Sequence, residues 1–129
     1  AAVPEGVARA FDPEAAALKL EVAAEASRNE RVAAIVRAAD GQGIASLAAT
    51  LASMRRARGH DDDDTTLAAM AEVIAALFEG LTLRAIRNPG QDREAAVGMV
   101  RRIIAGLAEV ATGDASATGT GVGSGAPGS

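Results

Sequence analysis

The chain has 129 residues, a formal net charge of −4 at pH 7 and no cysteine. The lack of cysteine excludes disulfides, thiolate nucleophiles and zinc–thiolate sites, and it is typical of an intracellular protein, so we expect a cytoplasmic location. The acidic balance and the scattered basic residues argue against direct binding of nucleic acid by this segment.

Both ends of the chain differ in composition from its middle. Residues 1–12 include Pro4 and Gly6 and begin with Ala1 rather than Met, so we interpret them as the remnant of a preceding helix or linker. Residues 112–129 are almost entirely Gly, Ser, Thr and Ala, a composition that predicts a disordered tail. Residues 13–111 are left as one domain with a modest core.

The first predicted helix begins at Pro13 and ends between Ser27 and Asn29. Asp12 is a suitable N-cap, and proline fits the first helical position because its missing N–H group has no helical partner there.

The second predicted helix spans residues 30–58, with Gly59 as its stop. Gly41 and Gly43 lie in its middle, where each glycine costs about 1 kcal/mol relative to alanine. We favour a kinked but continuous helix.

The acidic segment 60–66 (HDDDDTT) predicts a solvated loop. Its spacing lacks the alternating ligands and central glycine of an EF-hand, so no metal site is expected. Asp64 or Thr65 is the predicted N-cap of the next helix, whose N-terminus favours nearby carboxylates.

The third predicted helix runs to about Arg87 and is apolar on two faces. Its bulky stripe comprises Leu67, Met70, Ile74, Leu77, Phe78, Leu81 and Ala85, and its second stripe comprises Ala69, Val73, Ala76, Gly80 and Leu83. A surface helix needs only one apolar face, so this helix requires two partners. A chain of this length supplies one of them, and we expect a second copy of the molecule to supply the other.

The fourth predicted helix, residues 93–110, follows a turn at 88–90 and is capped by Asp92. It is strongly amphipathic, and no segment alternates as a strand does, so the fold class is all-α. No run of about 18 uncharged apolar residues predicts a membrane span. Since no nucleophile–base pair, cofactor motif or metal-ligand set is present, we expect no enzyme and no cofactor.

Three segments together resemble one known family. The stretch EVAAEASRNERVAAIVRAAD, then RRARG, then FEGLTLRAIRNPGQDREAAVGMVRRIIAGL, is similar to the C-terminal regulatory domain of the TetR (tetracycline repressor) family of transcription factors. The acidic residue–Gly–Leu element of that family corresponds to Glu79, Gly80 and Leu81. The Gly41/Gly43 pair and the four consecutive aspartates depart from the family pattern.

The resemblance implies an antiparallel bundle of about four main helices, the last two pairing with their copies in a dimeric four-helix bundle. It also implies a homodimeric repressor that binds a small, mostly apolar effector and relays this to an N-terminal helix-turn-helix. That DNA-binding domain is absent here, so we expect this chain alone not to bind DNA.

Helical faces then divide the candidate residues into two sets. The expected ligand-binding set is Leu20, Ile35, Ala39, Leu47, Leu51, Met54, Met70, Ile74 and Phe78. The expected dimer interface is Ala69, Val73, Ala76, Gly80, Leu83, Ala96, Met99, Val100, Ile103 and Leu107. The alternative is a stand-alone helical module that binds a different protein through its second apolar face.

Overall fold

The computed structural model describes residues 12–112, which form four helices and no strand. They are α2 (Pro13–Ala26), α3 (Glu30–Arg56), α4 (Asp64–Arg87) and α5 (Arg93–Glu109). The all-α prediction is confirmed. The predictions for residues 1–11 and 113–129 lie outside the described residues.

The helices begin where side chains cap them. Asp12 and Asp92 are the N-caps of α2 and α5, as predicted, and each accepts a hydrogen bond from a first-turn backbone N–H group. The N-cap of α4 is Asp63, one residue before the predicted position, and its carboxylate accepts from the N–H group of Thr66 at 2.7 Å. Carboxylates therefore define three of the four helix starts.

The second helix is continuous through Gly41 and Gly43, as predicted, but it ends at Arg56, two residues earlier than expected. Gly59 then adopts a φ of 83°, in the left-handed region that glycine accepts without a steric penalty. The glycine therefore turns the chain into the α3–α4 loop.

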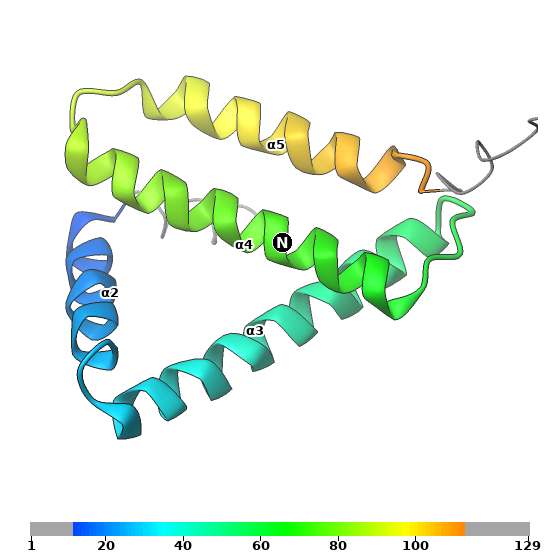
Figure 1. Ribbon diagram of the computed structural model, residues 1–129. Coiled ribbons are helices and arrows are strands. Elements are labelled where there is room, and N and C mark those ends of the chain that lie inside the picture. Colours follow the sequence, from blue (N-terminus) through cyan, green and yellow to red (C-terminus); the bar gives the residue numbers. More distant parts are fainter. Residues whose placement is uncertain (1–11, 113–129) are drawn as a thin grey trace, which may run out of the picture.

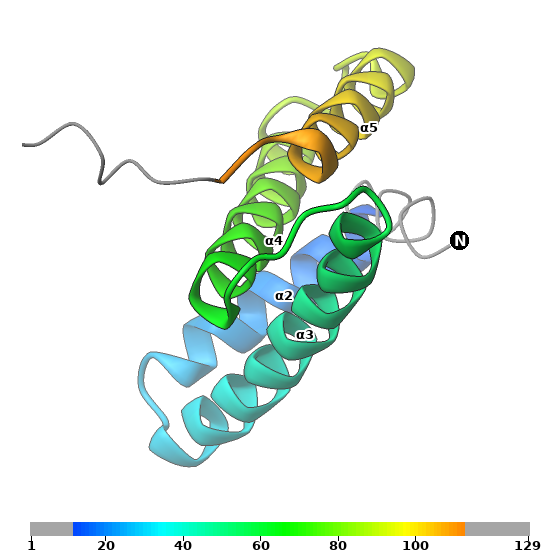
Figure 2. The ribbon, with the colours of Figure 1, turned by 90° about the vertical axis from the view of Figure 1, so that its right-hand side faces the viewer.

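In space, three of the helices outline a triangle. The carboxyl half of α3 meets the amino half of α4, the two helices diverge, and α2 closes the third side (Figure 1). Helix α5 runs antiparallel to α4 on the edge away from α2, as Figures 1 and 2 show.

Two small aliphatic clusters hold this arrangement together. One lies between α3 and α4 and comprises Leu51, Leu67, Met70, Ala71 and Ile74. The other lies between α4 and α5, where Val100 and Ile104 pack against Leu77, Phe78, Leu81 and Ala85. Phe78 contacts both clusters. The core therefore runs along one face of α4.

The opposite face of α4 is not covered by any other helix of residues 12–112. By length and composition this helix is apolar enough to cross a membrane, although the core helix of a soluble protein passes the same test. Only 28% of its most apolar stretch is buried in the single chain. Much of the helix is therefore free to meet another molecule.

Candidate functional site

An open groove lies between α2, α3 and α4, the three helices that outline the triangle. It has a volume of about 670 Å³. Its walls are Ala16, Leu18, Lys19, Leu20, Val22 and Ala23 from α2, Val36, Ala39 and Asp40 from α3, and Glu79, Thr82 and Leu83 from α4. The groove is thus mainly aliphatic, with three charged side chains.

The polar groups of the groove differ in how they are engaged. Thr82 is 5% exposed, and its hydroxyl donates to the carbonyl oxygen of Phe78 at 3.0 Å, so that proton is already used within α4. Lys19, Asp40 and Glu79 are exposed. A ligand in the groove would therefore contact mainly aliphatic side chains, with three charged side chains among them.

The structure distributes the predicted ligand-binding residues over three environments. Leu20 and Ala39 line the groove. Leu51, Met70 and Ile74 are buried in the α3–α4 cluster, against which Leu47 and Phe78 also pack. Met54 is half-buried, and Ile35 is 70% exposed. The structure therefore brings two of these nine residues together in the groove.

The predicted dimer residues divide in a similar way. Those that are exposed are Ala69, Val73, Ala76 and Gly80 on α4, with Met99 and Ile103 on α5. Val100 is buried between α4 and α5, Ala96 packs beside it, and Leu107 packs against the α3–α4 cluster. Leu83 lines the groove and is 37% exposed.

Sequence reasoning missed five apolar residues of the groove and one of the exposed α5 surface. In the groove these are Ala16, Leu18, Val22, Ala23 and Val36. The other is the exposed Val110, the C-cap of α5, which continues the line of Met99 and Ile103. The signal for the α2 residues was an apolar composition spread around most of that helix, which no single core face explains.

A buried ion pair lies at the other end of α3. The side chains of Arg55 and Asp62 are 0% and 3% exposed, and the Arg55 Nη2 group donates to Asp62 Oδ1 at 2.9 Å. Arg55 Nη1 donates to the carbonyl oxygen of Leu107 at 2.9 Å, and the hydroxyl of Thr112 donates to Asp62. We call Arg55, Asp62, Thr112 and the Leu107 carbonyl the arginine clamp.

The arginine clamp corrects the prediction of a solvated acidic loop, which is wrong for Asp62. Hydrogen bonds from Arg55 and Thr112, with the positive charge of Arg55, lower the pKa of Asp62 to about 2. The Leu107 carbonyl lies in the last turn of α5, where helical N–H partners run out, and the guanidinium supplies one. The clamp therefore joins α3, the loop and α5.

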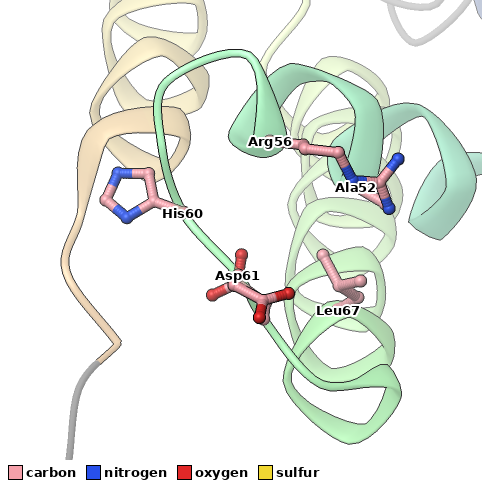
Figure 3. Close-up of a pocket in the computed structure, with 6 residues that line it drawn as sticks. Ala52, Arg56, His60, Asp61 and Leu67 are labelled. Atoms are coloured by element: carbon pink, nitrogen blue, oxygen red, sulfur yellow. The ribbon is translucent and has the colours of Figure 1, made fainter.

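A second cavity under the α3–α4 loop holds only about 20 Å³ (Figure 3). Ala52 and Arg56 of α3 and Leu67 of α4 border it, together with His60 and Asp61 of the loop. That volume suits about one water molecule. Within residues 12–112, no three His, Asp or Glu side chains are grouped to hold a metal ion.

Comparison with known proteins gave one match. Residues 6–109 match the family described as the C-terminal domain of BetI-type transcriptional repressors. No curated protein and no solved structure matched. The family match covers far more than half of the 129 residues and includes all four helices. This chain therefore belongs to the BetI-type C-terminal domains of the TetR family of transcriptional regulators.

Proposed function

We propose that this domain senses a small, largely apolar effector and dimerises, on behalf of a DNA-binding domain outside these residues. The observation that carries the proposal is the groove of about 670 Å³ between α2, α3 and α4. Binding sites for small molecules have volumes of roughly 300–1,000 Å³ and mostly apolar walls. Both properties are met here. A regulator of this kind works in the cytoplasm and needs no catalytic group.

The walls of the groove define the ligand further. Leu18, Leu20 and Val22 present aliphatic surface from α2, opposite Val36 and Ala39 of α3. Such walls favour an apolar body, because contact with them removes hydrocarbon from water on both sides. Lys19, Asp40 and Glu79 could make a small number of polar contacts with the ligand.

The proposed dimer uses the uncovered face of α4 together with that of α5. Ala69, Val73, Ala76 and Gly80 recur along α4. Met99, Ile103 and Gly106 of α5, with its C-cap Val110, recur with the same spacing. We call these eight residues the outer stripe. Since α4 and α5 are antiparallel, helical periodicity brings both lines to the same side of their contact, away from α3.

The small residues of the outer stripe suit a close helix–helix contact. A Cβ atom added at Gly80 or Gly106 would meet nothing within 4 Å in the single chain. No neighbour within residues 12–112 therefore explains why these positions are glycine. A second copy packing its own α4 and α5 against them is the partner we propose, in a symmetric contact.

The effector proposal is tested by thermal shift with two matched variants. We expect some members of a panel of small apolar compounds to raise the melting temperature of the wild type, since a ligand that binds only the folded state stabilises it by about 2.7 kcal/mol at 100 times its Kd. Ala39→Phe fills the groove and should abolish the shift. Ala38→Phe adds the same ring at an exposed neighbour outside the groove and should preserve it.

Two results would contradict the effector proposal. One is a broad panel that shifts nothing. The other is a shift that survives Ala39→Phe, because it would locate the ligand elsewhere.

The second candidate function is a helical module that binds a different protein. The outer stripe favours it too, because an exposed apolar face suits any complementary helix pair. Sedimentation velocity separates the two: a dimer at micromolar concentration supports the sensor, whereas a stable monomer supports the module.

A further inference from the structure

The two halves of α3 are held in different ways. Its second half contributes Ile44, Leu47, Ala48, Leu51 and Ala52 to the α3–α4 cluster, and Arg55 to the arginine clamp. Its first half contributes no residue to that cluster and contacts α2 instead, where Ala33 is buried. Every α3 member of the cluster therefore follows Gly43.

Between these halves, none of the described residues covers the helix. Each of the seven residues from Arg37 to Gly43 is exposed, which is nearly two full turns. A Cβ atom added at Gly41 or Gly43 would meet nothing within 4 Å, so no close neighbour requires glycine there. Glycine weakens an exposed helix because it has the largest backbone entropy to lose. The weakest point of α3 therefore coincides with its unsupported stretch.

We propose that Gly41-Gln42-Gly43 is a hinge, and that α2 with the first half of α3 forms a lid that swings on it to widen or close the groove. The lid carries most of the groove wall, including Leu20, Val36 and Ala39. The opposite wall belongs to α4, which the core clusters hold in place. Neither core cluster includes a lid residue, so movement at the hinge changes the groove and leaves both clusters in place.

Uncovered apolar side chains supply the driving force for closure. Leu18, Leu20 and Val22 line the groove from α2 and are 61%, 42% and 38% exposed. Bringing them toward α4, or onto an apolar ligand, removes this surface from water. In an empty groove these side chains are exposed to water. Burying them favours closure of the lid, and a bound apolar ligand would stabilise the closed position.

The fixed side of the hinge is defined by the arginine clamp. Arg55 binds Asp62 of the loop and the Leu107 carbonyl of α5, so the end of α3 cannot follow the lid. On the other side, α2 contacts α4 as well as α3, so the swing of the lid has to shift the α2–α4 contact. The lid therefore moves about Gly41–Gly43 relative to both α4 and the second half of α3.

Hydrogen exchange tests the hinge without any ligand. In the wild type, the amides of Ile44 and Ala45 should exchange faster than that of Leu51 on the same helix. Gly41→Ala/Gly43→Ala should slow Ile44 and Ala45 on the order of tenfold, because alanine makes local opening of the helix harder. Gly98→Ala is the matched control, since it is also helical, exposed and free of neighbours within 4 Å. It should leave both amides unchanged.

Distances between paired labels test the swing itself, and the cysteine-free chain allows clean labelling. Ala34→Cys on the lid and Glu72→Cys on α4 form the moving pair, while Ala49→Cys and Glu72→Cys form the fixed pair; all three positions are exposed. Labelled protein is diluted into an excess of unlabelled protein, so that distances arise within one subunit. The moving pair should give the broader distribution, and Gly41→Ala/Gly43→Ala should narrow it.

The hinge is refuted if the moving pair is as narrow as the fixed pair, or if the alanine substitutions change neither exchange nor distances. The hinge opens the groove whether or not an effector is found. A broad distance distribution for the moving pair, in a protein that no compound stabilises, would support the hinge and refute the effector proposal. A narrow distribution in a protein that does bind compounds would support the effector proposal and refute the hinge.

Discussion

At the scale of single residues, Arg55 has the greatest structural consequence. It lies on the same stripe of α3 as Leu47 and Leu51, yet it ends in a charge that the fold buries completely. Its planar guanidinium serves the Asp62 carboxylate and a helix-end carbonyl at once, which lysine could not do with the same geometry.

We expect Arg55→Met to lower the melting temperature strongly, because it leaves the Asp62 carboxylate buried without its partner. Arg58→Met is the control: its ion pair with Glu109 has side chains 39% and 67% exposed, and such pairs contribute about 0–1 kcal/mol. Adding Asp62→Leu to Arg55→Met should recover part of the loss. Equal melting temperatures for the two single variants would contradict this role of the clamp.

The clamp also predicts a dependence on pH. The folded protein lowers the pKa of Asp62 from 3.8 to about 2, so its contribution to the free energy of unfolding is complete well above pH 3.8. That contribution is lost as the pH falls from 3.8 toward 2. Urea unfolding across this range should show the decline, and Asp62→Asn should flatten it. The lowered pKa of Asp63, which its hydrogen bonds to Thr66 cause, accounts for a residual slope.

At the scale of elements, α3 is one continuous helix whose second half packs in the α3–α4 cluster and whose first half contacts α2. Leu51 is 2% exposed and lies in the α3–α4 cluster, whereas Ile35 is 70% exposed. The two residues are about 160° apart around the helix, so Ile35 points away from the face of Leu51, whereas Ala33 continues that face and is buried. All members of the α3–α4 cluster that α3 contributes follow the glycine pair.

Paired truncations compare the buried and the exposed face of α3. Leu51→Ala should lower the free energy of unfolding by about 2–5 kcal/mol, because it removes buried methyl groups and leaves a cavity. Ile35→Ala, on the same helix, should change it by less than about 0.5 kcal/mol. Chemical denaturation of both variants provides the comparison. A large loss for Ile35→Ala would mean that a partner covers the first half of α3 in solution.

Much of this fold could be predicted from the sequence, because helix starts depend on local chemistry. Asp12 and Asp92 were identified as caps from the residues beside them, and Gly59 was recognised as a stop. The candidate residues could not be assigned to core, groove or dimer interface from the sequence. Helical periodicity shows which residues share a face but not which neighbour covers that face. Leu51 and Leu20 both lie on apolar faces, and only the tertiary packing sends one to the core and the other to the groove.

The arginine clamp could have been anticipated in part. An arginine on the stripe of Leu47 and Leu51, followed by four aspartates, indicates a buried ion pair more than a solvated loop. Which aspartate would be its partner depends on the path of the loop, and the contact with Leu107 joins residues 52 positions apart. Such long-range contacts leave no local pattern.

At the scale of the whole molecule, the outer stripe should determine the oligomeric state. Ile103→Arg places a charge in the proposed contact and should convert the dimer to a monomer. Ala105→Arg adds the same side chain at an exposed position of α5 outside the stripe and should remain dimeric. Sedimentation velocity at micromolar concentration distinguishes them. If both variants keep the state of the wild type, α5 lies outside the interface.

The uncovered face of α4 has a further consequence for how the protein is made. In a newly synthesised subunit, much of the 24-residue apolar helix would be exposed to solvent until the subunit met a second copy. Folding and dimerisation would then be linked by mass action, so the melting temperature should rise with protein concentration. At low concentration in a cell, subunits would remain unpaired and open to proteolysis for longer. The lifetime of this regulator would therefore depend on its concentration.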